Sequence, residues 1–203
     1  MDVVYERGGW EGVLLSVDTF KGEEMRKRIA IDMDETICDT IARHLDWYNQ
    51  EFNQALIKAD LTGTKIYQKV PAEHVARVRS YPDNPDFFAD LTPFANAISV
   101  IQELHQHYDI FIATAAMEHP TSFAAKYEWL VKHLPFLSPM NFIFCGNKGA
   151  VHADYLIDDS SRHFESFVGK GVLFTAPHNV NEVADVRVND WLEARQMFLG
   201  KAS

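Results

Sequence analysis

The sequence predicts an α/β fold with a doubly wound parallel sheet and a small helical insertion after the first strand. Short apolar runs alternate with amphipathic helical stretches, which is the pattern of parallel strands joined by helical crossovers. Acidic residues follow the first apolar run at residues 32–35, as expected where a buried strand ends in a functional loop. The helical stretch between the first two strands is longer than a single crossover needs.

Five short strands and five helices account for this pattern. The strands are apolar runs at residues 29–31, 110–113, 142–145, 155–157 and 172–175. The helices are expected where apolar residues recur at helical spacing, at residues 39–56, 72–80, 93–104, 120–133 and 189–198, with a loop at 57–71. Pro93 would open the third helix, because proline is favoured at the first helical position.

The same pattern divides the chain into three parts. We expect residues 25–39 and 91–203 to form the α/β core domain, and residues 40–90 to form a helical cap over the sheet. Residues 1–24 are too short to bury a core, so we expect a disordered and dispensable tail. In a bacterial gene, the Lys-Gly-Glu-Glu run before Met25 fits a translated ribosome-binding site, which leads to the hypothesis that Met25 is the true start.

The composition indicates a globular protein that is suited neither to membranes nor to nucleic acid polymers. Hydrophobic residues make up 47% of the chain, and no apolar run approaches the ~20 residues that span a membrane. A formal net charge of −10 disfavours long nucleic acids, although a locally positive pocket can still bind a small anion. The two cysteines form no disulfide framework, so we expect a cytoplasmic protein. The oligomeric state does not follow from the sequence.

Residues with chemical potential follow the predicted strands. They are Asp32 and Asp34 after the first strand, Thr114 and Ala115 after the second, Lys148 after the third, and Asp158 and Asp159 after the fourth. Ligands of such sheets bind beyond the carboxyl ends of the strands. Taken singly, each residue is equally well explained as a helix cap, a turn residue or a solvated charge. Their occurrence together at successive strand ends favours a shared functional site over these separate explanations.

This set of residues suits phosphate chemistry supported by a magnesium ion. Crowded carboxylates repel one another unless a cation is bound, and oxygen ligands beside phosphate favour Mg²⁺. Asp32 and Asp34 point the same way in an extended strand end, so one can attack phosphorus while Asp34 serves the leaving oxygen. Thr114 and the Ala115 amide would hold phosphate oxygens. Lys148 would offset the charge that develops in the transition state.

The motifs resemble those of the haloacid-dehalogenase superfamily over about residues 28–198. Asp32-x-Asp34-x-Thr36 resembles the first motif, Thr114 the second, Lys148 the third, and Asp158-Asp159 the fourth. Other segments are similar to the 5′(3′)-deoxyribonucleotidases. They are Phe87-Phe88-x-Asp90-Leu91-x-Pro93, Asp109-Ile110-Phe111-Ile112-Ala113-Thr114, Ala153-Asp154-Tyr155-Leu156-Ile157-Asp158-Asp159 and Leu173-Phe174-Thr175-Ala176-Pro177-His178-Asn179.

The resemblance implies a fold of the haloacid-dehalogenase type and a Mg²⁺-dependent phosphomonoesterase that acts on deoxyribonucleoside monophosphates through an aspartyl-phosphate. It implies that Asp32 is the nucleophile and a metal ligand. Asp34 would be the acid/base and would bind metal through its backbone carbonyl. Asp158 would complete the metal ligands, and Asp159 would support the site.

The chain departs from the vertebrate-type enzymes around the substrate pocket. Glu35 and Ala115 stand where those enzymes carry Gly and Ser, and Thr40 stands where they place an aromatic that stacks on the base. Phe88 matches a pocket aromatic, and Tyr67 is the nearest candidate for a second one. We therefore assign Thr40 and Phe88 to the substrate pocket and expect the chemistry to be better preserved than the nucleotide preference.

Three alternatives stay open at this point. The first keeps the chemistry but changes the substrate to another small phosphate monoester, such as a sugar phosphate. The second is a receiver-type signalling domain, which also uses acids, Thr and Lys around Mg²⁺ but places its acidic pair after the first strand. The third is a catalytically inactive binding protein, against which the complete set of motif residues argues.

Overall fold

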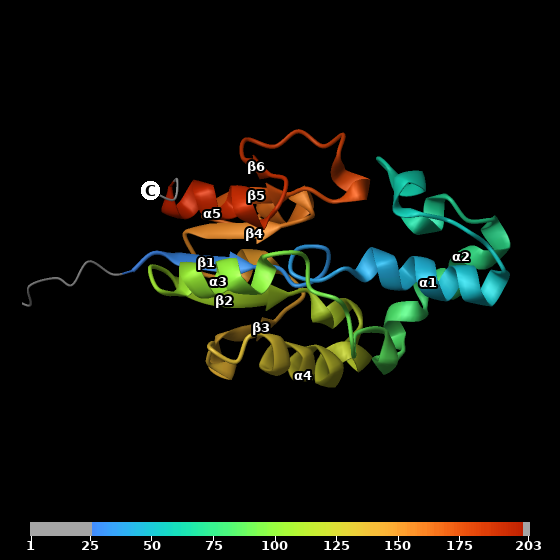
Figure 1. Cartoon of the computed structure of the whole chain (residues 1–203), viewed down its shortest axis with the longest axis horizontal. Helices are drawn as coiled ribbons and strands as arrows, with labels where there is room; N and C mark the ends of the chain where they lie inside the picture. Colours follow the sequence, from blue (N-terminus) through green and yellow to red (C-terminus); the bar gives the residue numbers. More distant parts are fainter. Residues whose placement is uncertain (1–25, 201–203) are drawn as a thin grey trace, which may run out of the picture.

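The computed structural model describes residues 26–200, so the expected tail at 1–24 and the start at Met25 lie outside the described residues. Six parallel strands form one sheet in the order β3-β2-β1-β4-β5-β6 (Figure 1). Their bounds are Arg28–Ile31 for β1, Asp109–Thr114 for β2, Phe142–Phe144 for β3, Tyr155–Asp158 for β4, Lys170–Phe174 for β5 and Arg187–Val188 for β6. Within residues 26–200, no helix combines the length and apolar character needed to cross a bilayer.

The strand order reverses at the centre of the sheet and thereby creates the place for a site. The chain moves outward from β1 to β2 and β3, then returns to β4 on the other side of β1. Ile29 of β1 pairs with Ile110 of β2 on one side and with Tyr155 of β4 on the other. In open α/β sheets, ligands bind at this switch point, beyond the carboxyl ends of the strands.

Five α-helices accompany the sheet. Their bounds are Thr40–Phe52 for α1, Ala72–Arg79 for α2, Ala97–His105 for α3, Phe123–His133 for α4 and Trp191–Leu199 for α5. Helices α3 and α5 lie side by side, and an Arg195–Glu103 ion pair of 2.6 Å joins them. The apolar residues of β1 are fully buried because helices cover the sheet, which explains why Ile29-Ala30-Ile31 contains no polar residue.

The segment between β1 and α3, residues 40–90, is here called the cap segment. It contains α1, α2 and 3-10 turns at Lys58–Leu61, Ile66–Gln68, Tyr81–Asp83 and Pro85–Phe87. Figure 1 shows α1 and α2 beyond the end of the sheet at which β1 terminates. The Gly63 amide donates to the Pro177 carbonyl at 2.8 Å, and His119 pairs with Asp83 at 2.7 Å. These two contacts tie the cap segment to loops that follow β5 and β2.

Several expected boundaries are wrong, each for a local reason. Pro93 does not open a helix, because it forms a bridge with Cys38, and α3 begins only after Asn96, whose φ is 63°. The first helix ends at Phe52 instead of 56, since Asn53 adopts a left-handed conformation with φ 48°. The expected loop at 57–71 contains two 3-10 turns. The two-residue strand β6 has too little sequence to produce an alternating pattern.

Two buried tryptophans fasten the loops around the end of β1. The indole nitrogen of Trp191 donates to the Thr36 carbonyl at 2.9 Å, which joins α5 to the loop after β1. The indole nitrogen of Trp129 donates to the Leu91 carbonyl at 2.8 Å, which joins α4 to the end of the cap segment. Both rings are almost completely buried. Each tryptophan therefore supplies core packing and satisfies a carbonyl that would otherwise be buried without a partner.

We expect Trp191→Phe to lower the free energy of unfolding by about 1–3 kcal/mol, because the buried Thr36 carbonyl loses its donor. Urea unfolding followed by circular dichroism measures the change. Trp47→Phe is the matched control, since the half-buried Trp47 makes no indole hydrogen bond to residues 26–200. Equal losses in the two variants would contradict the assigned role of the indole nitrogen.

Candidate active site

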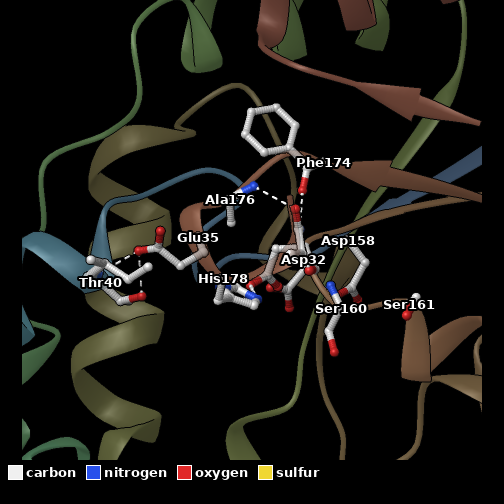
Figure 2. Close-up of polar contacts among 12 residues, drawn as sticks. Asp32, Glu35, Thr40, Asp158, Ser160, Ser161, Phe174, Ala176 and His178 are labelled. Atoms are coloured by element: carbon white, nitrogen blue, oxygen red, sulfur yellow. Dashed lines mark hydrogen bonds and ion pairs between the residues drawn. The ribbon is translucent and has the colours of Figure 1, made fainter. Parts of the chain in front are cut away.

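Three carboxylates converge where β1 and β4 end. Asp32 directly follows β1, Asp158 is the last residue of β4, and Asp159 is the next residue along the chain. One oxygen from each lies within 4.8 Å of the others, and Figure 2 shows Asp32 facing Asp158. Asp32 and Asp158 are 4% and 0% exposed. The strand register explains this arrangement, because Ile31 pairs with Ile157 and their successors meet at the sheet edge.

Lys148 supplies positive charge to this cluster. It follows β3 in a 3-10 turn, Lys148–Ala150, and its side chain is fully buried. Its ammonium group donates to Asp32 and, at 2.6 Å, to Asp158. Burial alone would lower the pKa of Lys148, but the charges of Asp32 and Asp158 outweigh it and raise that pKa. The lysine therefore stays protonated between two acids.

The carboxylates still carry more negative charge than one lysine can balance. Burial raises the pKa of Asp32 to about 7 despite Lys148, and the charge of Asp158 contributes to the rise. Burial and the charge of Asp158 raise the pKa of Asp159 well above its usual range. For Asp158, burial is outweighed by Lys148 and His163, and its pKa is lowered. This donor set of hard, crowded, buried oxygens fits a small divalent cation such as Mg²⁺.

Two histidines that the sequence analysis did not assign orient the acids. His163, in the turn after β4, contacts Asp158 with its Nδ1 at 2.8 Å. His178, in the turn after β5, contacts Asp159 with its Nε2 at 3.3 Å, and Figure 2 shows it beside Asp32. His178 belongs to a segment that resembles the deoxyribonucleotidases, but no pattern in the sequence indicates that either ring contacts an acid.

Asp34 lies next to a second buried lysine. Lys126 of α4 donates to Asp34 Oδ2 at 2.5 Å and to the Thr114 hydroxyl at 2.9 Å. Asp34 Oδ1 is buried and has no hydrogen-bond partner among residues 26–200. The carboxylate of Asp34 is thus held on one side and free on the other. Asp34 does not belong to the three-carboxylate group, so its side chain and that of Asp32 serve different places in the site.

Lys126 is not among the predicted site residues, although the sequence contains a signal for it. Lys126 occupies the apolar stripe of α4 together with Trp129 and Leu130, at the spacing that marks a buried helix face. A lysine at such a position requires a buried partner, because an unpaired ammonium group is costly to bury. Lys126 is 2% exposed, and its partners are Asp34 and Thr114.

The predicted phosphate-binding residues lie around the same point. Thr114 ends β2 and is completely buried, with its hydroxyl accepting from Lys126. Ala115 follows it and is partly exposed. Both residues come from the strand next to β1, so β2 brings them to the same sheet edge as Asp32.

A cavity of about 250 Å³ opens beside Asp34, between the cap segment and the loops of the core. Its walls combine apolar, aromatic and polar groups. They include Asp34, Glu35, Thr40, Ile41, His44, Leu61, Lys65, Ile66, Tyr67, Pro82, Phe87, Phe88, Glu118, His119 and His178. The predicted pocket residues Thr40 and Phe88 and the candidate Tyr67 thus share one cavity.

The aromatic side chains of this cavity are already in contact with cations. The Lys126 ammonium group lies 4.4 Å from the ring centroid of Phe88, and the Arg79 guanidinium group lies 4.0 Å from that of Tyr67. Phe88 is 3% exposed and packs edge-on against Phe87. The side chain of Thr40 donates to Glu35 at 2.8 Å. These contacts hold the predicted pocket residues in defined positions.

Solved structures with a similar fold are named as haloacid-dehalogenase hydrolases. One from Streptococcus pneumoniae superposes with a TM-score of 0.57 at 15% identity, covering 85% of this chain and 98% of that chain. One from Bacillus subtilis, solved with bound magnesium, has a TM-score of 0.52 at 13% identity, covering 85% of this chain and 98% of that chain. Such low identities show the fold alone, and they confirm the predicted doubly wound sheet of the haloacid-dehalogenase type.

Similar sequences extend over nearly the same residues. A Bacillus subtilis protein named 5′(3′)-deoxyribonucleotidase is 35% identical over 176 residues, which is 86% of this chain and 100% of that protein. A Staphylococcus aureus protein that carries this name provisionally is 45% identical over 174 residues, which is 86% of this chain and 96% of that protein.

A family model covers the whole of the site. The model described as 5′ nucleotidase, deoxy (pyrimidine), cytosolic type C protein matches residues 26–202. The matched range includes the three-carboxylate group, Lys126, Lys148 and the cap segment. It confirms the predicted enzyme class, a phosphoric monoester hydrolase of the 5′-nucleotidase type. The chain therefore belongs to the 5′ nucleotidase, deoxy (pyrimidine), cytosolic type C family.

Proposed function

We propose that this chain is a Mg²⁺-dependent 5′(3′)-deoxyribonucleotidase that hydrolyses deoxyribonucleoside monophosphates through an aspartyl-phosphate on Asp32. The observation that carries the proposal is the meeting of Asp32, Asp158, Asp159 and Lys148 beside a cavity that also contains Asp34. Membership of a nucleotidase family supports the substrate class. The free cysteines Cys38 and Cys145 fit a reducing compartment, so the proposal includes a cytoplasmic location.

Asp32 and Asp158 would hold the magnesium ion with their side chains, Asp34 would hold it with its backbone carbonyl, and Asp159 would support the site. The crowding of the three carboxylates supports this choice. The ion supplies the positive charge that lets an anionic nucleophile approach an anionic phosphate. The Lys148 ammonium group contributes a second positive charge at Asp32.

In the first step, an oxygen of the Asp32 carboxylate attacks phosphorus and the bond from phosphorus to the sugar oxygen breaks. Asp34 gives its proton to the leaving oxygen, so a neutral alcohol departs. In the second step, the Asp34 carboxylate takes a proton from water, whose oxygen displaces Asp32 and releases inorganic phosphate. The partnerless Oδ1 of Asp34, in a residue that lines the cavity, supports this double role.

Lys126 and Thr114 support the two steps from the other side. Lys126 holds Oδ2 of Asp34, which leaves Oδ1 to exchange the proton. The same ammonium group contacts Thr114, so it also adds positive charge where phosphate oxygens are proposed to bind near Thr114 and Ala115. Lys126 is in this sense a positioning residue for the acid/base.

The cavity favours a small monoester over a polymer. The cap segment covers the carboxyl end of β1, and its Phe88 and Tyr67 line the cavity together with Thr40. Apolar and aromatic walls suit a nucleobase, and a cavity of this size favours a small monoester over a phosphoprotein or a DNA end. The alternative of a sugar phosphate rests on the polar groups of the same cavity. The family match gives no support to a receiver domain or an inactive binding protein.

We expect the purified protein to release phosphate from deoxyribonucleoside monophosphates, and Asp32→Asn to abolish turnover because the amide cannot form the acyl phosphate. A panel of nucleoside monophosphates and sugar phosphates, assayed with Mg²⁺ for phosphate release, measures both. Substantial activity of Asp32→Asn would refute the covalent mechanism. A tenfold preference for a sugar phosphate would leave a phosphatase with a different substrate.

Removal of divalent ions by a chelator should abolish activity, and added Mg²⁺ should restore it, since the carboxylate group needs a cation. Mg²⁺ should also raise the melting temperature, because a ligand of the folded state stabilises that state. Differential scanning calorimetry measures this shift, which Asp158→Asn should reduce. Full activity in the presence of the chelator would disprove the metal assignment.

Replacement of the positioning lysine, Lys126→Met, should lower kcat for a deoxyribonucleotide by about 10²-fold, since Asp34 loses its holding contact. A nitrophenyl phosphate should lose less, because its acidic leaving group needs no proton from Asp34 in the first step and only the second step still uses Asp34. Lys132→Met, an exposed position on the same helix, is the control. Equal losses on both substrates would contradict a role of Lys126 in the transfer of the Asp34 proton to the leaving oxygen.

A further inference from the structure

Glu35 is a buried acid of the cavity wall to which the proposed chemistry assigns no role. It lies one residue after Asp34 and is 5% exposed. Its Oε1 accepts from the Thr40 hydroxyl at 2.8 Å and from the Ile41 amide at 2.6 Å, which ties it to the first turn of α1 (Figure 2). These contacts hold the side chain rigidly and use only one of its two oxygens.

The second oxygen of Glu35 has no partner. Oε2 is buried and accepts no hydrogen bond from residues 26–200. A buried acceptor without a donor typically costs about 1–3 kcal/mol. Figure 2 shows Oε2 on the side of the carboxylate away from Thr40. Since Glu35 lines the cavity, a bound molecule can supply the missing donor.

The backbone of Glu35 is strained in the same place. Its φ is 54°, in the left-handed region that residues other than glycine rarely adopt. Strain of this kind is typical of ligand clamps and active sites, where surrounding contacts maintain it. The contacts with Thr40 and Ile41 maintain it here. Capping of α1 does not explain why Glu35 adopts this strained backbone. Asp39 already caps that helix, because its side chain accepts a hydrogen bond from the Ala42 amide.

The position of Glu35 indicates which part of the substrate reaches it. Asp34 is proposed to serve the leaving oxygen, and this oxygen belongs to the sugar. Glu35 follows Asp34 in the wall of the same cavity, so the sugar is the part of the substrate that we expect beside it. In a 2′-deoxyribonucleoside 5′-monophosphate, the 3′-hydroxyl is the sugar's only hydrogen-bond donor.

We propose that Glu35 Oε2 accepts a hydrogen bond from the 3′-hydroxyl of a bound deoxyribonucleoside 5′-monophosphate and thereby selects, among 5′-monophosphates, those that carry this hydroxyl. The inference rests on the proposed function and deepens it. A site that contains a buried acceptor discriminates strongly against a ligand that lacks the donor, because the acceptor then stays unpaired. Glu35 is thus a specificity-determining residue that contacts the substrate outside the phosphate.

The test compares kcat/KM for a 2′-deoxyribonucleoside 5′-monophosphate and the matching 2′,3′-dideoxyribonucleotide. The wild-type enzyme should prefer the first by about tenfold or more, as expected when a buried acceptor is otherwise left without its donor. Glu35→Ala should bring the ratio close to one, and Glu35→Gln should leave an intermediate ratio. Asp39→Ala also removes a carboxylate and its contact with the Ala42 amide at the start of α1, but Asp39 does not line the cavity, so this control should keep the wild-type ratio.

The outcomes separate the inference from the function on which it rests. If the wild-type enzyme hydrolyses neither nucleotide, the proposed function fails. If it hydrolyses both equally well, the nucleotidase stands and the role of Glu35 is overturned. A preference that persists in Glu35→Ala also overturns it, because another residue then binds the hydroxyl. Glu35→Gln keeps the shape of the side chain and an oxygen for Thr40 and Ile41, so it decides the question where Glu35→Ala does not fold, and an unchanged wild-type ratio in that variant overturns the inference.

Discussion

The buried ion pairs between Lys148 and the acids Asp32 and Asp158 are the constraint on which the site depends. Three carboxylates within 4.8 Å of one another are not stable together without positive charge. Lys148 supplies one such charge from the turn after β3, while β1 and β4 supply the acids. The strand order places β1 and β4 side by side, so the pairing depends on the topology of the sheet.

A second lysine divides the site into two functional halves. Lys148 contacts the acids at the ends of β1 and β4, whereas Lys126 of α4 contacts Asp34 and Thr114. Only one residue separates Asp32 from Asp34, but each carboxylate contacts a different lysine. Asp32 contacts Lys148 and Asp34 contacts Lys126, which fits two different roles for the two acids. Each lysine offsets part of the negative charge of these acids within a chain whose formal net charge is −10.

The strands were easier to predict than the ends of the helices. The five expected strands appear, shifted by one or two residues, because buried parallel strands are continuous apolar runs. The helix boundaries at Asn53 and Asn96 were wrong, since both residues adopt left-handed conformations that depend on surrounding contacts. Strand β6, with two residues, is defined by its pairing with β5 and not by its own sequence. The proposed division into core, cap and tail stays a prediction.

The sequence by itself determined the fold class, the family and the residues placed at the strand ends. Strand ends of a parallel sheet meet at one edge, so Asp32, Thr114 and Asp158 could be grouped without a structure. Only the tertiary structure decided that Lys126 faces Asp34, that His163 and His178 contact the acids, and that Glu35 has an unpaired oxygen. These contacts join residues whose side-chain positions depend on how helices, turns and the cap segment pack. The apolar stripe of α4 indicates that Lys126 is buried, but no local pattern in the sequence identifies the partners of these side chains.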